Sequence, residues 1–150
     1  MPEHPSRNRF CRTVASTFEA VESTCQDLRV FLDARRVAAS RFATELVVRE
    51  FLNNAVLHGN RLDASKTADL EVCLGRIWIT VRVTDQGTGF DWRRVMRRPL
   101  EGAAATHGRG LTIGKTYGRR LTYSLGGRQV RVRLEKAPAN GDDDVTRLHD

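Results

Sequence analysis

The run from Ile77 to Thr84 constrains the fold more than any other segment of this sequence. Aliphatic side chains occupy every second position of it, in the order Ile-Trp-Ile-Thr-Val-Arg-Val-Thr. This period of two is typical of a strand that buries one face and leaves the other polar. Such a strand needs neighbours in a sheet and an apolar layer against its buried face. The segment therefore predicts a sheet that is covered on one side.

Four further segments resemble strands. Gly75-Arg76 and Gly126-Gly127 separate two pairs of strand-like runs, and both dipeptides suit the tight turns of hairpins. The four predicted strands beside the 77–84 run are Phe10–Thr17, Ala68–Leu74, Arg120–Leu125 and Gln129–Glu135.

Helical periodicity fills the space between the strands. Apolar residues recur at helical spacing from Glu19 to about Ala34, and again from Ser40, a predicted N-cap, to a stop at Gly59. A short helix is expected from Gly110 to Tyr117. Helices on one face of a mixed, mostly antiparallel sheet make a two-layer α/β sandwich of the α+β class.

Length and composition favour one globular domain. The chain has 150 residues, of which 40% are hydrophobic and 29% charged, as in ordinary folded proteins. We expect the domain to span residues 10–136, between a flexible tail at 1–9 and a disordered tail at 137–150. No apolar run could span a bilayer and the N-terminus lacks a signal-peptide core, so we expect a cytoplasmic protein with no membrane contact.

The charge and the cysteines exclude little by themselves. The formal net charge is +7, but no aromatic residues interleave with the basic ones as a nucleic-acid stacking platform requires. We therefore expect no direct nucleic-acid binding. Three widely spaced cysteines without a C-x-x-C pair predict buried free thiols rather than a disulfide framework or zinc site: Cys11, Cys25 and Cys73.

The first motif lies in the second predicted helix, within Glu50–Gly59. Glu50, Asn54 and His58 are spaced four apart, so they share one stripe of an otherwise apolar helix. A carboxylate and a carboxamide on one stripe can accept a proton and ligate Mg2+ through oxygen. A solvent-facing helix surface would show the same pattern.

The second motif is the loop Asp85–Phe90, directly after the alternating strand. An aspartate at a strand end can accept a hydrogen bond from the exocyclic amine of adenine, and Gly87 and Gly89 let the backbone approach a base or a phosphate. An ordinary loop would also fit. A calcium loop would need further carboxylates and a closing glutamate that this segment lacks.

The third motif precedes the last predicted helix. Glycines leading into a helix N-terminus present free N–H groups to an anion, and an arginine among them adds charge-assisted contacts to phosphate. A glycine-rich turn without a ligand would look alike. The residues are His107, Gly108, Arg109, Gly110 and Leu111.

The order of the motifs is more specific than any one of them. A helix, a strand-end loop and a loop entering a helix resemble the N box, first glycine box and second glycine box of the histidine-kinase-like (GHKL) ATPases, over about residues 10–136. The resemblance implies the Bergerat ATP-binding fold, a left-handed βαβ-type sandwich. Within that superfamily Glu50–Gly59 matches the anti-sigma factor serine kinases, whose N box reads E-x-x-x-N-A-x-x-H-G. Other branches carry a phosphoacceptor or transducer domain, which we do not expect beside the single domain of these 150 residues.

The resemblance implies roles for the motif residues. Asn54 would hold the Mg2+ that bridges the phosphates of ATP, and Glu50 would orient or deprotonate the acceptor hydroxyl. His58 would help to fix the helix end. Asp85 would bind the adenine amino group. The remaining nucleotide-binding positions are Gly87 and Gly89 around the base, and Gly108, Arg109, Gly110 and Leu111 around the phosphates.

Two features depart from the family pattern or stay open. The family places a threonine after the closing glycine pair, near the adenine, where this chain has Arg128. The lid expected between Asp91 and Thr106 is short and arginine-rich, and Arg97, Arg98 and Arg109 are all candidates for the γ-phosphate.

The implied function is an ATP-dependent serine/threonine kinase that acts as an anti-sigma factor. It would bind a sigma factor in one state, phosphorylate a STAS-domain antagonist protein in the other, and form a homodimer. The alternative is a nucleotide-gated switch that sequesters a partner without catalysis. Nucleic-acid binding rests on the net charge alone.

Overall fold

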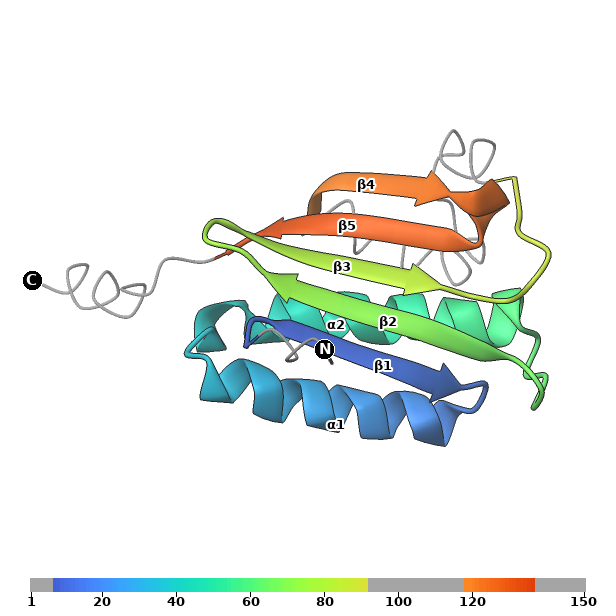
Figure 1. The fold of residues 1–150 in the computed structure, drawn as a ribbon, viewed down its shortest axis with the longest axis horizontal. Coiled ribbons are helices and arrows are strands. Elements are labelled where there is room, and N and C mark those ends of the chain that lie inside the picture. Colours follow the sequence, from blue (N-terminus) through green and yellow to red (C-terminus); the bar gives the residue numbers. More distant parts are fainter. Residues whose placement is uncertain (1–6, 92–117, 137–150) are drawn as a thin grey trace, which may run out of the picture.

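A computed structural model describes residues 7–91 and 118–136, which form an α+β sandwich (Figure 1). Its five strands follow the order β1-β2-β3-β5-β4, and every neighbouring pair is antiparallel. The strands are β1 (Arg9–Ala15), β2 (Thr67–Leu74), β3 (Trp78–Thr84), β4 (Gly118–Ser124) and β5 (Gln129–Glu135). Strands β3 and β4 therefore run in the same direction with β5 between them. Their connection lies outside the described residues, so the left-handed crossover stays a prediction.

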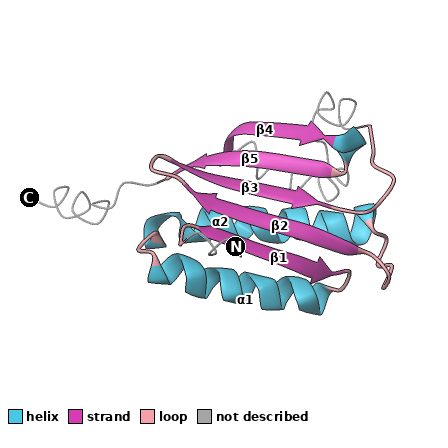
Figure 2. Ribbon diagram, in the orientation of Figure 1, coloured by secondary structure: helices cyan, strands magenta, loops and turns pink. Residues whose placement is uncertain are grey.

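The two long helices cover one face of the sheet, as Figure 2 shows. They are α1 (Phe18–Ala34) and α2 (Ala38–Asn54), which pack on each other, with α1 against β1 and α2 against β3. The alternation that predicted β3 is confirmed, because Ile79, Val81 and Val83 are buried against this layer. Burial of these side chains and of their helical partners is the main stabilising term of the fold. The predicted α+β class with helices on one face is confirmed.

The second helix begins earlier than the sequence predicts. Ser40 is not its N-cap: helix α2 starts at Ala38 after Val37, which makes no side-chain capping bond, and Ser40 is buried within the first turn. The connection from α1 is only three residues long and turns through Arg36 at a positive φ of 56°. By contrast, Thr17 caps α1, since its hydroxyl oxygen accepts from the backbone N–H of Ala20 at 3.1 Å.

Several element boundaries and burial predictions shift. Strand β1 begins at Arg9, within the expected N-terminal tail, and β4 begins at Gly118 rather than Arg120. Ile77 is exposed in the turn before β3 instead of starting the strand. The predicted helix Gly110–Tyr117 and the C-terminal tail lie outside the described residues.

The cysteines are free, but they are not all buried. Only Cys25 is fully buried, whereas Cys73 is partly exposed and Cys11 is exposed. The prediction of buried thiols is wrong for Cys11 because its position in β1 points to the polar face of the sheet. In the part of the chain that the structure describes, no helix has the length and hydropathy needed to cross a bilayer.

Candidate nucleotide site

The polar stripe of α2 faces away from the core. Phe51 and Leu52 are buried, with exposed fractions of 2% and 0%, while Glu50 and Asn54 are partly exposed. The helix therefore directs its apolar side chains to the sheet and presents the carboxylate and the carboxamide, one turn apart, on its outer side. The stripe that the sequence predicts is present at these two residues.

The helix does not continue in α-helical form to Gly59. Residues Ala55–Gly59 form a π-helical turn, closed by the Asn60 N–H donating to the carbonyl of Ala55 at 2.7 Å. The chain then passes through Arg61 and Leu62, both at positive φ. Wide turns of this kind occur frequently at functional sites. Because the π turn departs from a spacing of 3.6 residues, exposed His58 does not continue the stripe of Glu50 and Asn54 with α-helical geometry.

The loop after β3 packs directly against this helix end. A Cβ atom on Gly87 would overlap the carbonyl oxygen of Gly59, and a Cβ on Gly59 would overlap the carboxyl group of Asp85. Both positions therefore require glycine for the close approach of the two segments. The right-hand edge of Figure 1 shows the end of α2 and the loop that follows β3 at the same end of the sheet. The structure thus brings the first two motifs into contact.

Asp85 is held firmly but has one carboxylate oxygen to spare. Its backbone N–H donates to the carbonyl of Arg128 at 2.9 Å, and its Oδ1 accepts from the N–H of Gly87 at 2.8 Å. Among the described residues, no hydrogen bond or salt bridge engages Oδ2. Burial raises the pKa of this carboxyl group, and the bond from Gly87 only partly opposes the rise. A half-buried carboxylate with a free acceptor is the arrangement expected of a ligand-binding group.

Asn60 fixes the position of this loop, although the sequence analysis did not single it out. It is 1% exposed, and its Nδ2 donates to the hydroxyl of Ser16 at 3.1 Å and to the carbonyl of Thr67 at 2.9 Å. Its Oδ1 accepts from the backbone N–H of Gln86 at 2.8 Å. One buried amide therefore ties β1, β2 and the Asp85 loop to the end of α2. No local pattern marks such a residue, since all its partners are distant in sequence.

Replacing Asn60 with alanine is expected to destabilise the protein strongly. The change leaves the partly buried N–H of Gln86 and carbonyl of Thr67 without these partners, and each such loss costs about 1–3 kcal/mol. We expect the free energy of unfolding, measured by urea denaturation, to fall by about 2–4 kcal/mol. Asn53→Ala is the matched control, because the partly exposed Asn53 makes no side-chain hydrogen bond among the described residues. An equal loss of unfolding free energy in both variants would contradict the role of Asn60 in fixing the loop.

The second half of the loop pairs with the turn between β4 and β5. Gly89 has φ 83°, and its missing side chain makes room for the carbonyl of Gly126, which accepts from the N–H of Phe90 at 3.0 Å. The ring of Phe90 meets that of Tyr123 edge to face at 5.3 Å between centroids. The glycine pair of the β4–β5 turn thus lies beside the Asp85 loop, as the family pattern implies.

Arg128 replaces the family's threonine at this place. Its backbone carbonyl supports Asp85, while its side-chain Nε donates to the carbonyl of Leu125 at 3.0 Å. The departure therefore leaves the backbone support of Asp85 in place and changes only the side chain beside the loop.

The rest of the predicted site is not placed. Gly108, Arg109, Gly110 and Leu111 lie outside the described residues, as do Arg97 and Arg98. Within 7–91 and 118–136, no group of three or more His, Cys, Asp or Glu side chains could hold a metal ion by itself.

The family model described as histidine kinase-like ATPase domain matches residues 14–136, which includes the N-box helix, the Asp85 loop and the closing glycine turn. No curated protein matches the chain.

Proposed function

The chain belongs to the histidine kinase-like ATPase domain family, and from that premise we propose that it is an ATP-dependent serine/threonine-protein kinase that acts as an anti-sigma factor. ATP is the ligand that the family implies. The observation that carries the proposal is the Asp85 carboxylate, half-buried with Oδ2 unengaged among the described residues, held against the end of the helix that bears Glu50 and Asn54.

The residues present suit an adenine nucleotide. A carboxylate oxygen accepts from the amino group of adenine but opposes the carbonyl oxygen that guanine has in the same position. Since Gly59 and Gly87 have no side chains, backbone rather than side chain lies beside Asp85 at this close approach. The acceptor at Asp85 therefore fits the base that the family implies.

Glu50 and Asn54 suit the transfer end of the reaction. Asn54 offers an amide oxygen of the kind that Mg2+ accepts, together with phosphate oxygens of the nucleotide. The bound Mg2+ and ATP would supply the phosphoryl group and neutralise its developing charge. In this proposal Glu50, one helical turn away and also partly exposed, orients the acceptor hydroxyl and takes its proton. Together they form the positioning and proton-accepting pair that phosphoryl transfer requires.

The choice of partners rests on the N-box sequence. Glu50–Gly59 follows the E-x-x-x-N-A-x-x-H-G pattern of the anti-sigma factor serine kinases. In this proposal a sigma factor binds the ATP form, a serine or threonine of a STAS-domain antagonist accepts the phosphate, and the kinase works as a homodimer.

Phosphate transfer tests the proposal directly. The full chain is incubated with ATP labelled at the γ-phosphate and with each STAS-domain protein encoded in the same genome. We expect label on one serine or threonine of one antagonist, and none without Mg2+. If a partner binds in an ATP-dependent way but no antagonist receives phosphate, the kinase proposal is wrong and the nucleotide-gated switch takes its place.

A further inference from the structure

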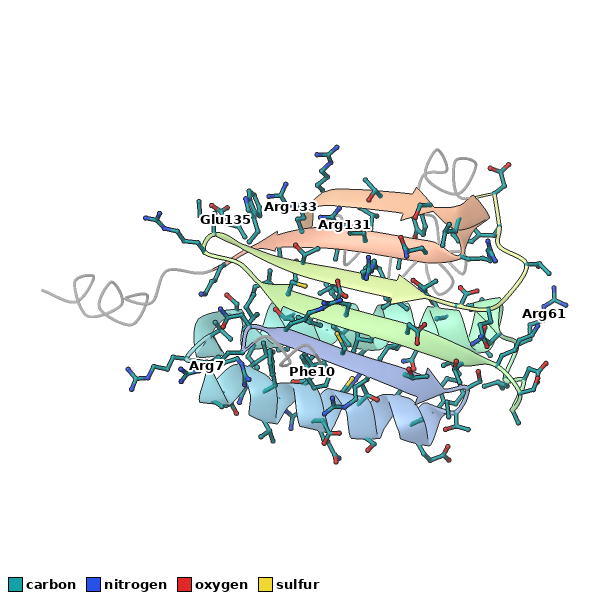
Figure 3. The ribbon with its side chains drawn as sticks, in the orientation of Figure 1. Arg7, Phe10, Arg61, Arg131, Arg133 and Glu135 are labelled. Atoms are coloured by element: carbon teal, nitrogen blue, oxygen red, sulfur yellow. The ribbon has the colours of Figure 1, made fainter. Side chains whose placement is uncertain are left out.

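The face of the sheet opposite the helices is polar and is not covered by any described element. Its side chains come from the alternate positions of each strand, which the burial of the intervening residues identifies. Figures 2 and 3 view this face from the front, with helix α2 behind it. Acidic and basic residues are mixed over β1 and β2, where Glu71 binds both Arg9 and Arg82.

Arginines are paired with arginines over the other half of this face. In the strand register Arg82 stands directly opposite Arg131, and Arg133 stands directly opposite Arg120. Residues directly opposite each other in antiparallel strands have Cβ atoms about 4.5–5.5 Å apart, and like charges there are destabilising. We call these four residues of β3, β5 and β4 the arginine face. Figure 3 labels Arg131 and Arg133 along β5.

Few of these charges are compensated inside the described chain. Arg82 donates to Glu71 at 2.9 Å, and the guanidinium of Arg133 lies over the Trp78 ring at 4.7 Å from its centroid. The exposed Arg131 and Arg120 have neither a hydrogen bond nor an ion pair among the residues described. Each of the pairs Arg82–Arg131 and Arg133–Arg120 thus keeps two like charges side by side, and within residues 7–91 and 118–136 one arginine of each pair has no hydrogen bond or ion pair.

We propose that the arginine face is a docking surface for an acidic segment of a partner protein. Carboxylates that bridge Arg82 with Arg131, or Arg133 with Arg120, would turn each repulsive pair into a favourable one. Residues two apart on β5 are separated by about 7 Å, and neighbouring strands by about 4.8 Å. Acidic side chains two apart on an extended segment, or three to four apart on a helix, match these spacings. The surface lies on the opposite side of the sheet from α2, so the proposal does not depend on the ATP site.

The same observations disfavour two other occupants. A nucleic acid would need rings on which to stack, but the one Trp of this face already has Arg133 over it. Glu135, directly opposite Trp78, and Glu71 would repel a chain of phosphates. A second copy that presented the same arginines across a twofold axis would bring like charges together.

The test uses the full chain and a fluorescein-labelled twelve-residue peptide of alternating Glu and Ser. Fluorescence anisotropy measures binding to wild type, to Arg120→Gln/Arg131→Gln, and to the control Arg36→Gln/Arg76→Gln, which removes the same charge from exposed turns. We expect the arginine-face variant to bind at least about fivefold more weakly than the control, and to melt about 1–3 °C above wild type because the like-charge pairs are gone. ATP binding should be unchanged in the arginine-face variant.

Three results would overturn the proposal. The first is an equal loss of peptide binding in the two variants. The second is single-stranded DNA of the same charge that binds more tightly than the peptide and depends on the arginine face. The third is a shift in the monomer–dimer equilibrium of the arginine-face variant without a loss of peptide binding. The last two would identify a nucleic acid or a second copy as the occupant. Each leaves the ATP proposal standing, because Asp85 is tested separately.

Discussion

Asp85→Asn is expected to weaken ATP binding by about tenfold to a hundredfold. Asparagine keeps an acceptor for the N–H of Gly87, so the loop retains its shape. With its oxygen on Gly87, however, asparagine has an NH2 group where Oδ2 stood, and this group then faces the amino group of adenine. Losing a hydrogen bond to a charged group costs about 1.5–3 kcal/mol, which corresponds to that range of affinity. Titration calorimetry with ATP measures the change.

The same variant should be at least as stable as wild type at neutral pH. Folding raises the pKa of Asp85, so the folded protein holds the proton more tightly than the unfolded chain does. Its contribution to stability is therefore favourable at low pH and is lost as the pH rises through the raised pKa. Asparagine removes the cost of the buried charge, and its advantage should shrink in acid. A variant that lost ATP affinity only because it unfolded would instead be less stable than wild type at neutral pH.

Asp63→Asn is the matched control for this experiment. Asp63 makes the same local contact, with its Oδ1 accepting from the backbone N–H two residues later, Ser65, at 2.8 Å. It is exposed in the link before β2. We expect its ATP affinity to stay within about twofold of wild type, since an exposed site away from the loop has little effect on binding. An equal loss of ATP affinity in both variants would show that Asp85 has no specific role in binding the nucleotide.

Glu50→Gln is expected to reduce phosphate transfer by about a hundredfold to ten-thousandfold, the usual contribution of a general base. Glutamine keeps the size and hydrogen-bonding reach of the side chain but cannot accept the proton of the acceptor hydroxyl. ATP affinity should stay within about threefold of wild type, because Glu50 acts on the acceptor hydroxyl rather than on the adenine ring of ATP. Single-turnover transfer to the antagonist, beside calorimetry with ATP, separates these two effects.

Glu19→Gln provides the control for the loss of a surface carboxylate. Glu19 is exposed in the first turn of α1 and does not belong to the α2 stripe. Its transfer rate should equal that of wild type. Undiminished transfer by the Glu50 variant would remove Glu50 from the mechanism, and transfer that falls together with ATP affinity would assign it to binding instead.

Residue patterns predicted the fold well because the decisive signals are local. The alternation of β3 and the periodicity of α1 each report one buried face, and β5 has the predicted bounds Gln129–Glu135. The start of α2 was misjudged at Ser40 because the tight connection through Arg36 decides it, not a capping side chain. Capping preference is weaker than the geometry of a three-residue connection between packed helices.

The site was predictable only in part. The spacing of Glu50 and Asn54 and the position of Asp85 after a strand are visible in one dimension. The bond from Gln86 to Asn60 and the support of Asp85 by Arg128 depend on contacts between segments far apart in sequence. Asn60 in particular looks like an ordinary residue after a helix stop, yet its side-chain amide makes hydrogen bonds with Ser16, Thr67 and Gln86.

The central claim is that the loop at Asp85 recognises adenine. Titration of the purified full chain with ATP and with GTP, each with Mg2+, tests it most directly. The account predicts saturable binding of ATP at one site per chain and binding of GTP weaker by at least about tenfold, because the Asp85 carboxylate would face a carbonyl oxygen. Equal affinity for ATP and GTP, or no saturable binding of ATP, would contradict it.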